Sequence, residues 1–252
     1  MFESSHVPTP FKIGKCKELI SLASLGLGQR KRTSELFRFG QKCKERIMLT
    51  PWLDELNAMK IVLGSSSPRR KAILKENVGI SKFRVEKSTF EEDIEKTGLT
   101  PEEYVMKTCE GKVNELKSRL KDFDLLICAD TVVCHEGHIF EKPADKEAAA
   151  AMLKLLSGSV HQVLTAVSIS SSGEGDKSVT FVEKTTVRFT DLGDKAIEGY
   201  VATGEPFDKA GGYGIQTLAA SFCRGIDGDP FNVYGFPVHA FCTELIRVLD
   251  LS

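Results

Sequence analysis

Residues 125–134 read LLICADTVVC, a stretch that indicates the fold class because it joins a buried strand to a polar break. The run Leu125–Ala129 is continuously apolar, as in strands that are covered on both faces of a sheet. Asp130 follows it, and a carboxylate at the carboxyl end of a central strand points into the crevice where open α/β sheets bind ligands. Asp130 is therefore a candidate metal ligand or general base, and the alternative is an aspartate that starts a turn or caps a helix.

Strands and helices are mixed on both sides of this stretch. Alternating or β-branched apolar runs predict strands, whereas capping residues and apolar spacings of three and four predict helices. The expected strands are 61–63, 125–129, 132–134, 162–169 and 179–189, and the expected helices are 69–77, 101–120, 146–156, 194–203 and 237–249. The last two strands suit an antiparallel hairpin, and residues 204–236 are glycine-rich and irregular. This order predicts an α/β or α+β fold with a mixed sheet.

The composition limits the possible function classes. The chain has 252 residues, is 41% hydrophobic and carries a net charge of −1, so it can build a core and is not a uniformly basic nucleic-acid binder. No apolar run approaches the roughly 20 residues that a membrane-spanning helix needs. The seven cysteines include no Cys-x-x-Cys pair, which favours reduced thiols in an intracellular protein over a zinc site. We therefore expect a cytoplasmic protein with no nucleic-acid or membrane partner.

The first fifth of the chain differs in charge from the rest. Residues 1–50 contain ten basic and four acidic side chains, a net charge of +6. We predict a poorly structured basic extension over residues 1–58 and one folded domain over residues 59–252. The basic excess suits an organellar transit peptide, but acidic residues are interspersed, and a nonspecific basic arm or an alternative first exon are further interpretations.

A small-residue loop with two arginines, Ser65–Arg70, follows the first strand. The backbone N–H groups of such a loop can approach a ligand, and the arginines add fixed positive charge, so the loop is a candidate polyphosphate cradle. The alternative is an ordinary helix start with solvated arginines, in which Ser67 is the N-cap and Pro68 the first helical residue. The loop is not a Walker A motif, because it lacks the Gly-Lys-Ser/Thr ending.

Three further segments carry side chains suited to phosphate chemistry. The acidic run 91–93 offers oxygen ligands to a hard cation, or it is a solvated face. Lys112 and Lys142 are candidates for phosphate contacts, or they are solvated lysines. Segment 205–216 has three glycines in four residues, which require unusual backbone angles or a close backbone approach. Its Gln216 amide can read a base edge, and the alternative is a structural glycine turn.

Five motifs occur in one order along the chain: LGSSSPRRKAIL, FEED, ADTVV, EKPADKEAAAAMLKLLSGSVHQVLTAV and GEPFDKAGGYGIQ. Over residues 60–250 the chain resembles the Maf family of nucleoside triphosphate pyrophosphatases. The resemblance implies hydrolysis of a nucleoside 5′-triphosphate to the monophosphate and pyrophosphate with a divalent cation, magnesium or manganese. It also implies a homodimer and a mixed twisted sheet with flanking helices in two lobes around a cleft, as in inosine triphosphate pyrophosphatase.

The resemblance also assigns roles to residues of this chain. Asp130, in the ADT motif, matches the family's proton acceptor, and Asp130 and Glu92 are the expected metal ligands. The remaining matches are catalytic positions at Glu92, Lys142 and Lys209 and substrate-binding positions at Ser65, Arg70 and Lys112. The implied reaction is an in-line attack of water at the α-phosphorus, with Asp130 activating the water and the cations stabilising the leaving pyrophosphate.

Three positions bear on the choice of base. The family group that acts on thymidine and uridine triphosphates has Arg, Thr and Gln there, and this chain has Arg69, Thr131 and Gln216. A sister group, which acts on 7-methylguanosine triphosphate, tends to have Trp, Gln and Glu. The resemblance therefore implies dTTP, UTP and modified pyrimidine analogues as substrates. A 7-methylguanosine triphosphate pyrophosphatase and a catalytically idle nucleotide-binding or interaction module are the alternatives.

Overall fold

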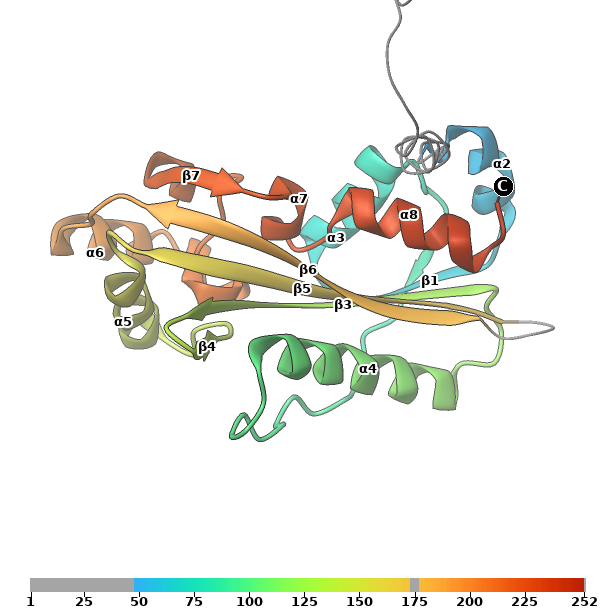
Figure 1. The fold of residues 1–252 in the computed structure, drawn as a ribbon, viewed down its shortest axis with the longest axis horizontal. Coiled ribbons are helices and arrows are strands. Elements are labelled where there is room, and N and C mark those ends of the chain that lie inside the picture. Colours follow the sequence, from blue (N-terminus) through green and yellow to red (C-terminus); the bar gives the residue numbers. More distant parts are fainter. Residues whose placement is uncertain (1–47, 173–176, 252) are drawn as a thin grey trace, which may run out of the picture. The chain divides into compact units, whose positions relative to one another are not determined.

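A mixed β-sheet forms the centre of the part of the chain that the computed structural model describes, residues 48–172 and 177–251 (Figure 1). The strand order is β2-β1-β3-β5-β6-β7, and β4 pairs with β3 outside this path. The pairs β1–β2 and β1–β3 are parallel, whereas β3–β4, β3–β5, β5–β6 and β6–β7 are antiparallel. The predicted α/β class with a mixed sheet and flanking helices is confirmed.

The helices and strands of the described residues have the following bounds. The strands are β1 (Ile61–Gly64), β2 (Arg84–Val85), β3 (Leu125–His135), β4 (His138–Phe140), β5 (Val160–Ser171), β6 (Ser178–Phe189) and β7 (Cys223–Asp227). The α-helices are α2 (Leu53–Ala58), α3 (Pro68–Ile73), α4 (Pro101–Arg119), α5 (Lys146–Leu156), α6 (Asp194–Ala202), α7 (Pro230–Val233) and α8 (Val238–Val248). A π-helical turn, η2 (Leu74–Val78), continues α3, and short 3-10 turns are η1 (Thr50–Trp52), η3 (Glu205–Asp208), η4 (Ala210–Gly212) and η5 (Leu218–Ser221).

Strand β3 runs without a break through Asp130, so the prediction that a strand ends there is wrong. One edge of β3 pairs with β5 over residues 125–134, which keeps the strand extended. The other edge pairs with β1 only as far as Gly64–Cys128 and with β4 only from Val133 onward. What ends near Asp130 is therefore the neighbouring strand β1, and this leaves an unpaired stretch on one edge of a central strand.

The alternation of side chains along β3 divides the core between two faces of the sheet. Leu126, Cys128 and Val132 pack in the cluster that includes α4, whereas Leu125 and Ile127 pack in the cluster that includes α8. Figure 1 shows α4 and α8 on opposite faces of the sheet. Since successive residues of a strand point to opposite faces, Asp130 is on the α4 side and Thr131 is on the other.

Helix α4 begins at the capping box that the sequence predicted. Thr100 Oγ1 accepts a hydrogen bond from Glu103 N at 3.2 Å, and Glu103 Oε2 accepts one from Thr100 N at 2.8 Å. Pro101 occupies the first helical position. The helix is thus fixed at its start, and its buried apolar face packs with the β3 residues that point to the same side of the sheet.

The folded domain begins earlier than the predicted boundary at residues 58 and 59. Leu49 and Leu56 are buried and pack in the cluster that contains α8, so η1 and α2 belong to the core and not to an extension. The predicted helix at 69–77 and the final helix are confirmed as α3 with η2 and as α8. The predictions for residues 1–47 lie outside the described residues.

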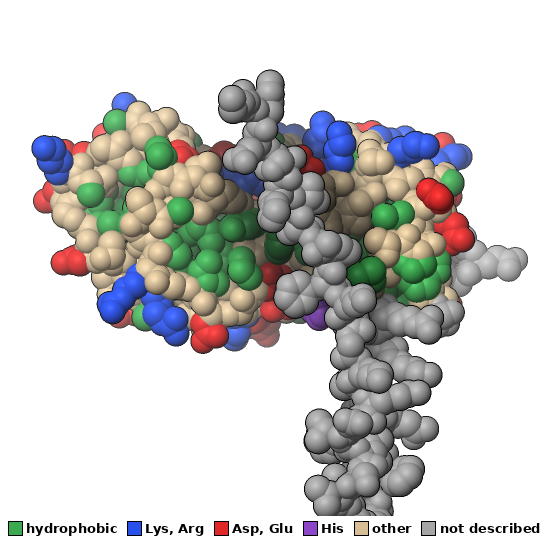
Figure 2. Space-filling model, turned by 90° about the horizontal axis from the view of Figure 1, so that it is seen from above, with side chains coloured by type: hydrophobic (Ala, Val, Ile, Leu, Met, Phe, Trp, Pro, Cys, Tyr) green, Lys and Arg blue, Asp and Glu red, His purple; other side chains and the backbone are tan. Residues whose placement is uncertain are grey.

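Strand β7 is absent from the sequence prediction, because it is a short edge strand with Gly225 at its centre and no clear alternation. Figure 2 views the side on which β7 and α8 lie, and hydrophobic side chains gather on the half where Figure 1 draws β7. The five cysteines among the described residues are free, whereas Cys16 and Cys43 lie outside them. No helix in the described ranges is long and apolar enough to cross a membrane.

Candidate active site

A cavity of about 580 Å³ opens beside the unpaired stretch of β3. Its walls come from the loop between β1 and α3, from α4, from the connection between β4 and α5, and from segments 208–216 and 233–235. All ten residues that the sequence analysis named as site residues line it: Ser65, Arg69, Arg70, Glu92, Lys112, Asp130, Thr131, Lys142, Lys209 and Gln216. Residues that are distant in sequence thus share one cavity.

Asp130 is paired with a lysine of α4. Lys112 Nζ lies 2.7 Å from Oδ1 of Asp130 and 2.9 Å from Oε1 of Glu92, so one ammonium group bridges the two carboxylates. Burial acts to lower the pKa of Lys112, but the charges of Asp130 and Glu92 outweigh it and raise the pKa above its ordinary value. Lys112 therefore stays protonated, and it fixes one oxygen of the buried Asp130 carboxylate.

The loop that carries Glu92 is held against α4 by a close contact and by hydrogen bonds. A Cβ atom on Gly111 would lie 2.3 Å from Cζ of Phe90, so glycine at this position lets the Phe90 ring lie on the helix. Glu115, one turn further along α4, accepts a hydrogen bond from Ser88 Oγ at 2.8 Å. These contacts bring the acidic run to the cavity, where only Glu92 of its three carboxylates lies in the wall.

Arg70 lies among protein acceptors. Its Nε donates to Gly235 O at 2.9 Å, and its Nη1 donates to Ser65 Oγ at 3.1 Å and to Ala129 O at 2.7 Å. Its Nη2 donates to Thr131 Oγ1 at 2.8 Å. Two residues expected to meet the substrate directly, Arg70 and Thr131, are therefore bound to each other.

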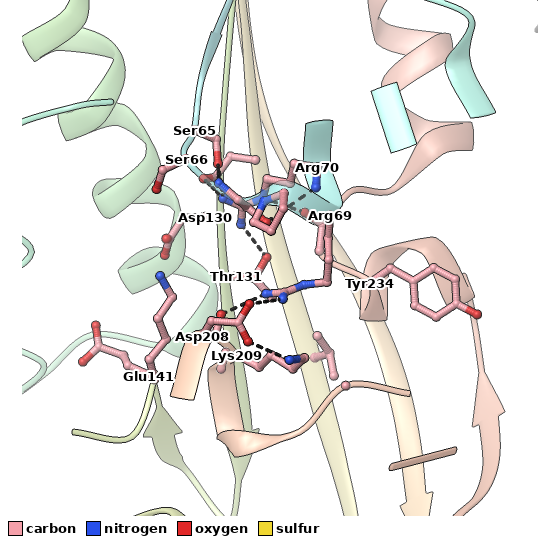
Figure 3. Close-up of a pocket in the computed structure, with 18 of the residues that line it drawn as sticks. Ser65, Ser66, Arg69, Arg70, Asp130, Thr131, Glu141, Asp208, Lys209 and Tyr234 are labelled. Atoms are coloured by element: carbon pink, nitrogen blue, oxygen red, sulfur yellow. Dashed lines mark hydrogen bonds and ion pairs between the residues drawn. The ribbon is translucent and has the colours of Figure 1, made fainter. Parts of the chain in front are cut away.

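Arg69, by contrast, crosses the cavity to a residue that the sequence analysis did not name as a site residue, Asp208 (Figure 3). Arg69 Nη1 lies 2.5 Å from Asp208 Oδ2, and Lys209 Nζ lies 2.6 Å from the other oxygen, Oδ1. Burial acts to raise the pKa of Asp208, but the hydrogen bonds from Lys209 and Arg69 hold it below its usual value. The carboxylate of Asp208 thus holds both cations. The sequence feature that could have identified Asp208 as a site residue is its position directly before Lys209.

The glycine-rich segment confirms the predicted backbone requirement. Gly211 and Gly212 have φ angles of +68° and +72°, a region that favours glycine. A Cβ atom on Gly211 would also lie 2.8 Å from Cγ2 of Val133 on β3. The close packing of this segment on β3 brings Lys209 and Gln216 to the same cavity as Asp130.

Glu141 is a second wall residue that the sequence analysis missed. Its Oε1 accepts a hydrogen bond from Tyr104 Oη at 2.7 Å, and its Oε2 lies 2.6 Å from Lys96 Nζ. Burial acts to raise the pKa of Glu141, but the bonds from Lys96 and Tyr104 lower it. Its neighbour Lys142 lines the cavity. The side-chain partners of Glu141 come from α4 and from the loop before it, which no local pattern reveals.

The acidic groups suit a hard cation only in part. Among the described residues no group of three or more His, Cys, Asp or Glu side chains is placed to hold a metal ion. Asp130 and Glu92 share the Lys112 ammonium, so their oxygens converge on one point that carries positive charge. Two carboxylates fit magnesium, which keeps several waters and is bound by one or two carboxylates together with substrate phosphates.

Several proteins are similar to this chain over the region that contains the cavity. A Geobacillus protein named "dTTP/UTP pyrophosphatase" is 43% identical over 75% of this chain and 98% of its own length. A Bacillus pumilus protein of the same name is 42% identical over 76% of this chain and 95% of its own. A human protein named "Probable bifunctional dTTP/UTP pyrophosphatase/methyltransferase protein" is 41% identical over 80% of this chain, which spans about a third (34%) of the human protein's length.

Among solved structures, a HAM1 protein from Coxiella burnetii matches with a TM-score of 0.39 and 14% identity, over 77% of this chain and all (100%) of that one. The family model described as "Maf-like protein" matches residues 60–248, most of the folded domain and every segment that lines the cavity. The chain therefore belongs to the Maf family.

Proposed function

We propose that this protein hydrolyses nucleoside 5′-triphosphates, dTTP, UTP and modified pyrimidine analogues among them, to the monophosphate and pyrophosphate, and so removes non-standard nucleotides. Similar proteins named dTTP/UTP pyrophosphatase support this proposal. The single observation that carries it is one cavity in which a lysine-held carboxylate, Asp130, faces cations from three other segments. A carboxylate that can accept a proton and a set of cations for phosphate oxygens are what this hydrolysis needs.

Asp130 is the residue that we assign to proton transfer. Lys112 binds its Oδ1, so Oδ2 is the oxygen that would accept the proton of the attacking water at the α-phosphorus. The ammonium of Lys112 holds the carboxylate in one orientation and remains positively charged beside the developing negative charge. Lys142 and Lys209 are assigned to the leaving pyrophosphate, because both line the same cavity from another wall.

Asp208 holds two cations of the cavity in place. It holds Arg69 and Lys209 in the structure, and a triphosphate that enters the cavity brings phosphate oxygens that compete for the same N–H groups. We expect the two cations to exchange part of this carboxylate contact for substrate.

Asp130 and Glu92 are the residues that we propose to hold magnesium or manganese. Their oxygens already converge on a cation, and the set of two carboxylates leaves coordination positions for water and for phosphate oxygens. A metal ion bound there supplies positive charge to the phosphate oxygens. Lys112 is then one of the cations that share the two carboxylates.

For the base we propose that Gln216 reads a pyrimidine edge, because its amide can both donate and accept a hydrogen bond and it lines the cavity. We also propose a cytoplasmic homodimer, and a dispensable extension in the residues before 48. These last proposals rest on the family resemblance and on the charge of residues 1–50.

A panel of nucleoside triphosphates tests the function. Release of nucleoside monophosphate is measured by chromatography, with and without magnesium, for the wild type, Asp130→Asn and the exposed control Asp54→Asn. We expect release from UTP and dTTP with the wild type and with the control, and a loss in Asp130→Asn. Preferential hydrolysis of 7-methylguanosine triphosphate would refute the pyrimidine assignment. Binding without hydrolysis of any triphosphate would show an idle nucleotide-binding module.

A further inference from the structure

Arg70 has almost no free hydrogen-bonding capacity. All but one of its guanidinium N–H groups are used by four acceptors, which lie in the loop after β1, in β3 and in the loop before α8. Three of the four acceptors are Ser65 Oγ, Ala129 O and Gly235 O, at 3.1, 2.7 and 2.9 Å. To grip a phosphate with both nitrogens of its fork, Arg70 would have to release these groups.

The neighbouring Arg69 makes the contrast clear. Its guanidinium reaches across the cavity to Asp208, whereas that of Arg70 forms no ion pair with any described carboxylate. Burial lowers the pKa of Arg70 from its ordinary value, although the charge of Asp130 acts to raise it. Both arginines line the cavity, but their partners differ: Arg69 pairs with the carboxylate of Asp208 across it, whereas Arg70 binds neutral acceptors in β3 and in the two loops beside it.

The hydroxyl proton of Thr131 is also used within the protein. Its Oγ1 accepts the bond from Arg70 Nη2 and lies 3.0 Å from Thr165 Oγ1 on β5. Thr165 Oγ1 donates to Asn232 O at 3.1 Å, so its own proton is used and Thr131 must be the donor to Thr165. The bonds thus run in one direction, from Arg70 through Thr131 and Thr165 to Asn232. The single proton of the Thr131 hydroxyl is not available to a base.

We propose that Arg70 and Thr131 are positioning residues that form an internal clamp, which fixes the Ser65 loop relative to Asp130. Two of the acceptors of Arg70, Ala129 O and Thr131 Oγ1, flank Asp130 on β3, and a third is Ser65 Oγ on the loop that faces it. The clamp spans the stretch of β3 that β1 and β4 leave unpaired. It therefore replaces the missing strand contacts where the reaction needs a rigid frame.

Kinetics of Thr131 variants separate this role from base reading, and this test rests on the proposed hydrolysis. Thr131→Val is close in shape and lacks the hydroxyl, whereas Thr131→Ser keeps it. We expect Thr131→Val to lower kcat by about tenfold or more on every triphosphate that the wild type hydrolyses, with KM little changed, and Thr131→Ser to restore it. If Thr131→Val instead changes the ratio of UTP to GTP turnover and leaves kcat for UTP intact, Thr131 reads the base and the clamp is refuted.

A second measurement does not need activity. Urea unfolding of the wild type, Arg70→Lys, Thr131→Val and the double variant forms a double-mutant cycle. Lysine keeps the charge of Arg70 but cannot make its fork of bonds, so we expect the two substitutions to be strongly non-additive. Additive effects would refute the clamp. If the wild type hydrolyses no triphosphate, the proposed function fails, and this cycle still tests the clamp.

Discussion

Replacing Lys112 with methionine removes the ammonium group that bridges Asp130 and Glu92 and keeps most of the side-chain volume. In the wild type Lys112 Nζ lies 2.7 Å from Asp130 Oδ1 and 2.9 Å from Glu92 Oε1. The variant leaves two carboxylates that converge without a shared cation. We expect a loss of stability, a loss of turnover and a stronger response to magnesium.

The size of the stability loss follows from the burial of the three groups. A hydrogen bond between charged groups contributes about 1.5–3 kcal/mol. The side chains of Lys112 and Asp130 are each 12% exposed, so this pair keeps most of that value, whereas Glu92 is 46% exposed and solvent screens its share. We expect the free energy of unfolding to fall by about 2–3 kcal/mol, which lowers the Tm of a domain of this size by roughly 4–12 °C.

Thermal unfolding and steady-state kinetics measure these effects, with Lys107→Met as the control because Lys107 is an exposed lysine on the same helix. We expect kcat of Lys112→Met to fall by about 10²-fold, because Asp130 loses its fixed orientation. Added magnesium should raise the Tm of Lys112→Met more than that of the wild type. An unchanged Tm, or an equal fall in the Lys107→Met control, would refute a stabilising role of the Lys112 bridge. An equal rise in Tm with magnesium in both proteins would refute the proposal that Asp130 and Glu92 bind the metal.

The pH dependence of stability gives an independent check on Lys112. Its folded pKa is raised above the unfolded value of 10.5, because the neighbouring carboxylates outweigh burial. The stabilisation is therefore fully present below pH 10.5 and is lost as the pH rises through the raised pKa. As the pH rises above that value, the free energy of unfolding measured in urea should fall more for the wild type than for Lys112→Met. Equal losses in the two proteins would contradict a stabilising role of the Lys112 charge.

Three further predictions concern the base, the nucleotide and the domain boundary. Asp130→Asn should lower kcat by about 10²–10⁴-fold with an unchanged circular dichroism spectrum, and a variant that keeps more than about a tenth of wild-type kcat would remove it from the base role. Gln216→Glu should lower kcat/KM for UTP and dTTP by roughly 5–150-fold more than for a guanine triphosphate, since a carboxylate cannot donate, and equal losses would contradict base reading. Deleting residues 1–56 removes Leu56, which is buried at 1% exposure, and should lower the Tm, whereas deletion of 1–47 keeps that contact and serves as the control.

Local patterns were sufficient wherever neighbours along the chain determine the structure. The capping box at Thr100, the N-cap at Ser67 and the alternation of β5 each predicted an element that the structure confirms. The same logic failed at Asp130, where a polar residue interrupts an apolar run but the strand continues. Pairing with β5 along the whole strand outweighs that interruption, and no sequence window contains this information.

Most of the residues around the cavity could also be named from motifs, because nine of the ten stand in one of the five quoted motifs and Lys112 lies between two of them. The contacts between these residues could not be predicted from the motifs. Arg69 and Arg70 are adjacent and alike in sequence, but their partners, Asp208 on one side and Thr131 and Gly235 on the other, come from segments far along the chain. Glu141 and Asp208 were missed for the same reason.

By itself, then, the sequence determined the order of the longer helices and strands, the mixed sheet and ten of the polar side chains around one site, because these depend on local periodicity, capping and motif identity. The tertiary structure alone decided that β1 stops where β3 continues, that Lys112 bridges Asp130 and Glu92, and that the guanidinium of Arg70 is occupied by neutral acceptors of the protein. The physical reason is that pairing, ion-pair geometry and hydrogen-bond saturation depend on distances between atoms remote in sequence, and these distances exist only after the sheet has formed.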